Sequence, residues 1–320
     1  MGERGALAIY VGRRLVALVV MLAVISFGIF GLLYLAPGDP VAAILGRGHH
    51  SPAAIQAVRH QYHLDKPFLE QYVIWAKGVL HFRFGSSITT SLPVREEITS
   101  RLPTSMFLGV YAFVLTLVFG IGLGLLAALK SRTLLDRGTV AASLIGLSTP
   151  AFVAGVFLIY LFAIAVHWFP ASGRGDGFVD ELWHLTLPAI SLALTSIAYV
   201  LKHTRAAVLG VLEQDYVVFA RARGLSLRRI LGTYMLRNAL IPVITISGLV
   251  LSGLVVGAVL TEVTFSIQGV GDLLVQSANS KDVPTIQAVA VLVAALIIVA
   301  NLLADIAYAF ADPRVRLGRS

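Results

Sequence analysis

The chain has 320 residues, of which 57% are hydrophobic and only 13% are charged, with no cysteine and a net charge of +8. Soluble domains carry about 25% charged residues, so this composition indicates a membrane protein and excludes a disordered one. The lack of cysteine excludes disulfides, a thiol nucleophile and cysteine-held metal centres. The positive charge would suit either nucleic acid or basic loops beside a membrane, and its position along the chain decides between them.

Six runs without Asp, Glu, Lys or Arg are near or above the roughly 20 residues that a helix needs to cross a bilayer. They cover residues 15–36, 102–129, 139–166, 185–201, 239–261 and 285–304. The fourth run is short and could be a buried core helix, but His184 and Lys202 flank it and can lie at the interfaces, so we retain it as a span. The first run is too long for a signal-peptide core and is expected to remain as an anchor. We therefore predict an all-α integral membrane protein with six transmembrane helices.

The distribution of basic residues predicts the orientation of these spans. If the N-terminus is cytoplasmic, the segments 1–14, 130–138, 202–238 and 305–320 face inward and hold 16 of the 25 Lys and Arg residues. Of the nine that face outward, seven lie in the long first loop, where the rule carries little weight. Both termini are thus expected in the cytoplasm, and the basic charge is explained by topology rather than by nucleic acid.

The first outward loop, residues 37–101, has helix-starting signals of its own. Pro52 and Pro67 are each placed to begin a helix, and Pro93 begins a shorter one. This pattern predicts a small, mostly helical extracytoplasmic cap between the first two spans.

Four histidines, at positions 49, 50, 60 and 63, crowd one stretch of that loop. A metal site is one interpretation of this cluster. No cysteine or close carboxylate completes a tetrahedral ligand set, however, so we favour solvated histidines.

Residues 202–238, between the fourth and fifth spans, are too regularly patterned to be a simple connection. A helix is predicted over 214–223, Gly224 interrupts it, and Ser226 can cap a second helix. Apolar residues then recur with helical spacing on one face of that second helix, at Leu227, Ile230, Leu231, Tyr234 and Met235.

Three interpretations of this helix–glycine–helix unit compete. A DNA-binding helix-turn-helix would need a three-helix core and access to a duplex, and a unit of 37 residues between two spans has neither. The second is a pair of helices lying on the bilayer surface. The third is a docking element for a cytoplasmic partner.

The sequence lacks the motifs for nucleotide binding and for catalysis, which limits what this chain can do by itself. No stretch satisfies the phosphate-binding pattern of glycine, four residues, glycine, lysine and serine or threonine; the nearest, residues 124–131, has leucine at 129. The acids are scattered through loops and form no paired-carboxylate or Ser-His-Asp arrangement. The six runs contain no Asp, Glu, Lys or Arg that would mark a proton or ion relay. We therefore expect no catalytic residue, cofactor or metal on this chain and an energy source outside it.

Small residues one turn apart occur twice within the spans, at Gly120 with Gly124 and at Gly253 with Gly257. Such pairs let two helices approach closely in a membrane. They are weak indicators, because glycine is common in membrane helices.

Several motifs resemble one family of transport proteins. They include Arg13-Arg14 before the first span, residues 36–40 after it, 148–152 in the third span, 168–170 with Gly173, 282–284 before the last span and 312–314 in the tail. The most specific match comprises residues 215–216, 220–226 and 237–242. On these motifs the chain resembles the B-type permease subunit of dipeptide and oligopeptide ABC importers, in the binding-protein-dependent transport system inner membrane component family.

The resemblance implies that residues 202–238 form the family's EAA-type coupling loop, whose short helix inserts into a groove on an ATPase subunit. Ala220 and Gly224 would be its small positions, and the loop would join the fifth span near Pro242. The implied coupling residues are Asp215, Tyr216, Ala220, Arg221, Ala222, Arg223, Gly224, Leu225, Ser226, Asn238 and Pro242.

The implied fold is that of a type I ABC importer permease in the bacterial cytoplasmic (inner) membrane. Its expected partners are a homologous second permease, two cytoplasmic ATPase subunits that bind ATP and Mg, an extracytoplasmic solute-binding protein, a di- or oligopeptide substrate and membrane lipid. Import of another small solute, such as nickel or glutathione, is the alternative within the family. A partner-independent channel or a structural membrane protein is the alternative outside it.

Overall fold

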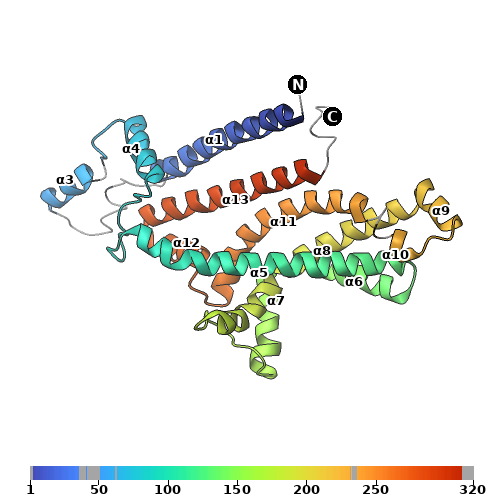
Figure 1. The fold of residues 1–320 in the computed structure, drawn as a ribbon. Helices are drawn as coiled ribbons and strands as arrows, with labels where there is room; N and C mark the ends of the chain where they lie inside the picture. Colours follow the sequence, from blue (N-terminus) through green and yellow to red (C-terminus); the bar gives the residue numbers. More distant parts are fainter. Residues whose placement is uncertain are drawn as a thin grey trace.

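The computed structural model describes residues 3–35, 41, 51–61, 63–230, 232 and 236–311. These residues are almost entirely helical, and within them the β pairing is limited to one isolated bridge between Ser86 and Pro93 (Figure 1). The helices are α1 (Glu3–Leu35), α3 (Pro52–Gln61), α4 (Phe68–Leu80), α5 (Val94–Leu129), α6 (Leu134–Ser148), α7 (Ala151–Leu158), η1 (Ile159–Ala165), α8 (Phe178–Leu212), α9 (Asp215–Ala222), α10 (Leu227–Ile230), α11 (Leu236–Thr264), α12 (Val270–Ser280) and α13 (Val283–Ala311).

Five helices in the described ranges are long and apolar enough to cross a membrane. They are Gly12–Gly31 within α1, α5, α8, Ile246–Thr264 within α11 and Val283–Ala307 within α13. The chain is therefore an all-α, multi-pass membrane protein. The count of crossings becomes six if α6 and the α7–η1 segment together form one span.

Helix ends differ from the predicted ones in two places. The short helix predicted to begin at Pro93 is not separate, because α5 runs without a break from Val94 into the second predicted span. The fourth predicted span, 185–201, is the middle of the 35-residue α8, which continues through the first part of the predicted coupling loop to Leu212. Hydropathy detects the apolar part of a helix, whereas the hydrogen-bonded helix continues through polar and charged residues beyond it.

The third predicted span, 139–166, is not one straight helix. α6 and the α7–η1 segment meet at an angle of 106°. Thr149 has extended dihedrals of φ −99° and ψ 117° at the break, as expected for a residue before proline, and Pro150 starts the next segment. Two carbonyls at the break accept hydrogen bonds from α8: Ser191 Oγ donates to Ala151 O at 2.6 Å, and Thr195 Oγ1 donates to Thr149 O at 3.2 Å.

The core lies where α5, α8 and α11 pack together. On α5, a β-carbon at Gly120 would come within 2.8 Å of Val200, and one at Gly124 within 2.7 Å of Thr204, so these two glycines permit the close approach of α8. On α11, Gly257 similarly faces Leu192, whereas Gly253 has no neighbouring atom within 4 Å of such a β-carbon. The close-approach interpretation is thus confirmed for the first pair and for one member of the second.

The bundle has two distinct ends. The N-terminal end of α1, the C-terminal end of α13, the α5–α6 turn and the α9–α10 unit all lie toward one end (Figure 1). There Arg14 Nε lies 3.2 Å from Asp305 Oδ2 and links α1 to α13. Helices α3, α4 and α12 lie toward the opposite end (Figure 1).

Candidate functional site

The α9–α10 unit follows α8 directly and has a buried side of its own. Val217, Ala220 and Ile230 are buried together, and partly buried Val211, Leu212 and Leu225 pack against them. The end of α8 thus supplies part of the small core on which α9 rests. This packing fixes which face of α9 points away from the protein.

Gly224 provides the turn between α9 and α10. Its φ is +75°, in the left-handed region that glycine adopts without cost. Its N–H donates to Arg221 O at 2.9 Å, and the Leu225 N–H donates to Ala220 O at 3.2 Å. This pair of bonds is the Schellman arrangement, and the packing of Leu225 against the small core completes it.

The requirement for glycine at 224 is conformational rather than steric. A β-carbon there would meet no atom within 4 Å, and the residue is exposed. Ala220 has the opposite character, because it is 5% exposed and faces the buried cluster. The two small positions predicted from the sequence therefore do different work: Ala220 permits packing and Gly224 permits the turn.

The outer face of α9 is apolar and exposed. Phe219 is 70% exposed, Val218 54% and Tyr216 40%. Arg221, Ala222 and Arg223 are exposed as well. Water solvates such an apolar face poorly.

The other predicted coupling residues fall at both ends of the unit. Asp215 is the first residue of α9, where a negative charge interacts favourably with the positive end of the helix dipole. Ser226 immediately precedes α10, and its carbonyl accepts from the N–H groups of Arg229 and Ile230 at 3.0 and 3.1 Å. Asn238 and Pro242 lie in the first two turns of α11. Leu231, Tyr234 and Met235, predicted on the apolar face of the second helix, lie outside the described residues.

One ion pair near the α9–α10 unit was not predicted from the sequence. Arg205, on α8, binds Asp136, on α6, through two hydrogen bonds of 2.6 and 2.9 Å. Asp136 also accepts from the Arg132 N–H at 2.9 Å and is buried. A two-point bond of this kind fixes orientation as well as distance, so the start of α6 is held against the part of α8 that leads to α9. The partners are 69 residues apart, and no local pattern signals such a pair.

A second unpredicted feature lies at the opposite end of the bundle. Glu262 is fully buried in α11, and its Oε2 accepts from the N–H groups of Gly271 and Asp272 at 2.8 and 3.1 Å. The carboxylate thereby caps the N-terminus of α12. A β-carbon on Gly269 would overlap this carboxyl group, so the turn before α12 needs a glycine there.

Glu262 lies directly after the fifth predicted span, 239–261, and inside the membrane-length part of α11, Ile246–Thr264. The charge-free run ends at Thr261 because Glu262 is charged. A span defined by the absence of charged residues cannot include this residue.

The long loop between α1 and α5 is attached to the start of α13 through Asp282. Its carboxylate accepts from the Ser87 hydroxyl at 2.5 Å, from the Ile88 N–H at 3.2 Å and from the Thr285 hydroxyl at 2.8 Å. Asp282 is buried and directly precedes α13, so one side chain serves both as helix cap and as anchor for the loop.

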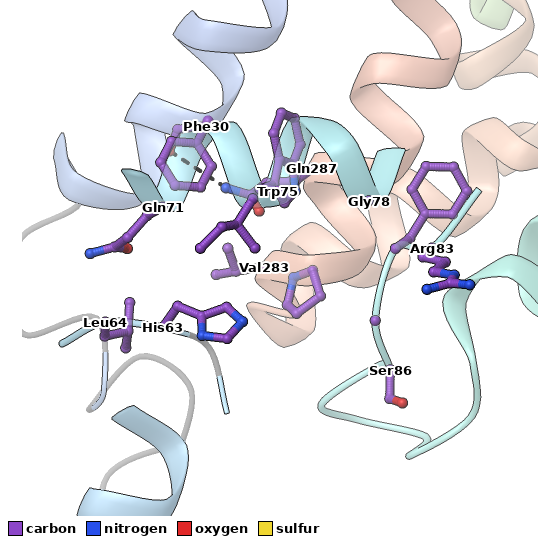
Figure 2. Close-up of a pocket in the computed structure, with 14 residues that line it drawn as sticks. Phe30, His63, Leu64, Gln71, Trp75, Gly78, Arg83, Ser86, Val283 and Gln287 are labelled. Atoms are coloured by element: carbon purple, nitrogen blue, oxygen red, sulfur yellow. Dashed lines mark hydrogen bonds between the residues drawn. The ribbon is translucent and has the colours of Figure 1, made fainter. Parts of the chain in front are cut away.

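Beside this anchor lies a cavity of about 340 Å³, between α1, α4 and the start of α13 (Figure 2). Aromatic and aliphatic side chains form most of its wall, and Figure 2 shows Trp75 beside Gln287, whose amide donates to Phe30 O at 3.5 Å. Its lining comprises Phe30, His63, Leu64, Gln71, Ile74, Trp75, Gly78, Arg83, Phe84, Gly85, Ser86, Val283, Pro284 and Gln287.

Of the four histidines considered as metal ligands, His63 contributes to the wall of this cavity, and His49 and His50 lie outside the described residues. Across the described part of the chain, no group of three or more His, Cys, Asp or Glu is placed to hold a metal ion.

Several membrane-length helices that pack into one bundle, with a compact helical unit exposed at one end, define a multi-pass membrane protein. The family model described as "Binding-protein-dependent transport system inner membrane component" matches residues 120–317, and the model of that component's N-terminal part matches residues 7–109. The chain therefore belongs to the binding-protein-dependent transport system inner membrane component family.

Curated relatives align over nearly their full length. A probable peptide ABC transporter permease protein from Sinorhizobium fredii is 38% identical, covering 97% of this chain and 100% of its own length. The di/tripeptide transport system permease protein DppB of Pseudomonas aeruginosa is 37% identical, with 96% and 98% covered. The dipeptide transport system permease protein DppB of Escherichia coli K12 is 35% identical, again with 96% and 98% covered.

A solved structure shares the fold. A chain of the MetNI methionine ABC transporter, in inward-facing conformations, aligns with a TM-score of 0.58 and 16% identity, covering 67% of this chain and 96% of that chain. The expected membership of the family, and an all-helical permease fold, are thus both confirmed.

Proposed function

We propose that this chain is the permease subunit of an ATP-driven importer that carries di- or oligopeptides across the bacterial cytoplasmic membrane. The names of the relatives that align along almost the whole chain support a peptide substrate. Membership of a binding-protein-dependent transport family supports the assembly of this chain with partners. They are a homologous second permease, two ATPase subunits that bind ATP and Mg, and an extracytoplasmic solute-binding protein.

The α9–α10 unit is the surface that receives an ATPase subunit. The observation that carries this assignment is the division of α9 into a buried face, at Val217 and Ala220, and an exposed apolar face, at Val218 and Phe219. The buried face couples the unit rigidly to α8, so that a displacement of α9 is transmitted into the bundle core. The exposed face provides the apolar area that a docking groove would cover.

This assignment places the α9 end of the bundle in the cytoplasm. The positive-inside rule supports that orientation, because the segments at this end carry most of the Lys and Arg residues. The N- and C-terminal ends of the described bundle lie there as well (Figure 1).

Docking is tested by Phe219→Ser in the assembled complex, with Phe178→Ser as the matched control. Both rings are highly exposed, but Phe178 begins α8, far from α9. We expect Phe219→Ser to weaken co-purification of the ATPase subunits and to reduce ATP-dependent uptake into proteoliposomes, because it removes an anchor from the docking face. Phe178→Ser should leave both unchanged. Normal uptake and co-purification for Phe219→Ser would overturn the docking assignment.

The substrate is tested in the same proteoliposomes with unmodified protein. Uptake of a labelled dipeptide should be reduced by excess unlabelled di- and tripeptides and not by nickel or glutathione. Competition by nickel or glutathione alone would transfer the assignment to that solute. Passage of substrate through the permease chain without ATPase subunits would favour a channel.

A further inference from the structure

Helix α4 lies against α1 at the end of the bundle opposite α9 (Figure 1). The Tyr72 ring stands edge-on to Phe27 with centroids 5.1 Å apart, and Trp75 lies 5.4 Å from Phe30. The Tyr72 hydroxyl is 2.9 Å from Ser26 Oγ and donates to Ala23 O at 3.3 Å. The contact therefore involves the last turns of a membrane-length segment, and not only the loop beyond it.

The position of Ala23 sets the depth of this contact. Ala23 lies inside the membrane-length part of α1, Gly12–Gly31, and twelve residues before the end of the helix at Leu35. At a rise of 1.5 Å per residue this is about 18 Å from the end of the helix, compared with a hydrocarbon core of about 30 Å. Since the Tyr72 side chain reaches that level and the Phe68 and Tyr72 rings contact Phe27, α4 lies beside the membrane-length segment rather than above it.

The sequence of α4 divides its surface into separate faces, since successive residues are about 100° apart around a helix. One face packs on α1 through Phe68, Tyr72 and Trp75. Another, formed by Gln71, Ile74 and Gly78, lines the cavity in Figure 2. Two outward faces remain, and they differ in polarity.

The first outward face is an apolar stripe, defined by Leu69, Val73 and Leu80. These side chains are 66%, 46% and 78% exposed, and they recur at the i, i+4 and i+11 positions of one helix face. The second outward face is next to the stripe and carries Glu70 and Lys77, both exposed. A helix with apolar and charged outward faces side by side has the pattern of one that lies in a membrane interface.

Lipid is the occupant that fits the apolar stripe. Phe27, which α4 contacts, is itself 42% exposed, and α1 exposes Val20 and Val24 in the preceding turns. The stripe therefore continues, at the same level, a surface that already belongs to a membrane-length helix. In water these leucine and valine side chains would cost free energy, whereas among acyl chains they would not.

We propose that α4 is immersed in the membrane leaflet at the C-terminal end of α1, with the apolar stripe among the acyl chains and Lys77 and Glu70 at the level of the lipid headgroups. The long first loop is then attached to the bilayer by this helix, in addition to its attachment to α13 through Asp282. The cavity wall formed by α4 is held at the membrane surface for the same reason. The inference does not depend on which solute the transporter carries.

The absence of cysteine allows single fluorescent labels to test this placement. Cysteine is introduced singly at Leu69, Val73 or Leu80, and at Glu70 or Lys77 as matched controls on the other outward face of the same helix. Each labelled chain is purified with its partner subunits and placed in phosphatidylcholine liposomes. Quenching is measured with aqueous iodide and, separately, with lipids that carry a nitroxide near the start of the acyl chain.

We expect nitroxide lipids to quench labels at the three stripe positions more strongly than labels at the two control positions, and iodide to show the reverse order. Strong iodide quenching at the stripe would show that it faces water and would overturn the proposal. Protection from both quenchers would show that protein covers the stripe and would also overturn it. These positions are exposed, so substitution there should be tolerated, and size-exclusion chromatography of the complex verifies assembly of each variant.

Discussion

At the scale of single residues, Gly224 separates a backbone requirement from a steric one. Its φ of +75° is costly for residues with a β-carbon, by about 1–2 kcal/mol, although the site has room for a side chain. Asparagine tolerates this conformation better than alanine does, despite its greater size. We therefore expect ATP-dependent uptake to decrease in the order Gly224, Gly224→Asn, Gly224→Ala, Gly224→Val.

This order distinguishes two reasons for a loss of activity. If Gly224 were needed because a partner surface approaches it closely, the smaller alanine would be tolerated better than asparagine. Uptake in proteoliposomes, compared at equal amounts of assembled complex, decides between them. Equal and normal uptake for the alanine and valine variants would contradict the turn assignment.

The residue scale also shows what could be predicted from the sequence. A glycine between two helical patterns is a local signal, and it predicted the turn at 224. The buried side of the α9–α10 unit could not be predicted in this way, because it depends on contacts in the folded structure: Val217 and Ile230 are buried together beside Leu212 at the end of α8. The buried position of Glu262 could not be predicted from the sequence, because the apolar run that predicts its helix stops at the residue before it.

At the scale of elements, the break between α6 and α7 depends on hydroxyl groups supplied by α8. Ser191 Oγ donates to the Ala151 carbonyl at 2.6 Å, and Ser191 is fully buried. Removing this donor leaves a carbonyl without that partner in an apolar environment. We expect Ser191→Ala to lower the stability by about 1 kcal/mol, measured by thermal unfolding in detergent.

Ser196→Ala is the matched control for that change. Ser196 lies on the same helix, is partly exposed, and is less than two turns from Ser191. It should leave the unfolding temperature unchanged. Equal effects of the two substitutions would show that the loss comes from altering α8 and not from the bond to the broken span.

The helices also show what hydropathy does not predict, namely where a helix ends and where it bends. Charge-free runs predicted where the apolar centres of the long helices lie, but not their ends, because α5 begins at Val94 with charged residues that form helix in water. The 106° break had no hydropathy signal, since both of its arms are apolar. Proline at 150 permits such a break, and the donors on α8 that stabilise it are 40 or more residues away in sequence.

At the scale of the whole molecule, the broken segment determines the number of crossings. α8 has 35 residues and so is about 50 Å long, which exceeds the thickness of the hydrocarbon core. Because α8 is also one of the membrane-length helices, we expect its two ends to lie on opposite faces of the membrane. Its C-terminal end carries α9, at the same end of the bundle as the α5–α6 turn (Figure 1).

We therefore expect the segment from α6 through η1 to cross the membrane once, despite its bend. It leaves the α5–α6 turn and must reach the opposite face, where α8 begins. A re-entrant loop would return to the starting face and place α9 on the other side from that turn. We therefore predict six crossings, with residues 166–177 on the face opposite to residues 130–133.

Labelling of single cysteines tests this topology in cells. Asp176→Cys lies before α8, and Lys130→Cys lies between α5 and α6; both native side chains are exposed. With an impermeant maleimide, Asp176→Cys should react in intact spheroplasts, while Lys130→Cys should react only after the membrane is opened. Reaction of both positions from the same side would mean that α6 and α7 form a re-entrant loop, and reaction of Lys130→Cys alone in intact spheroplasts would reverse the proposed orientation of the whole bundle.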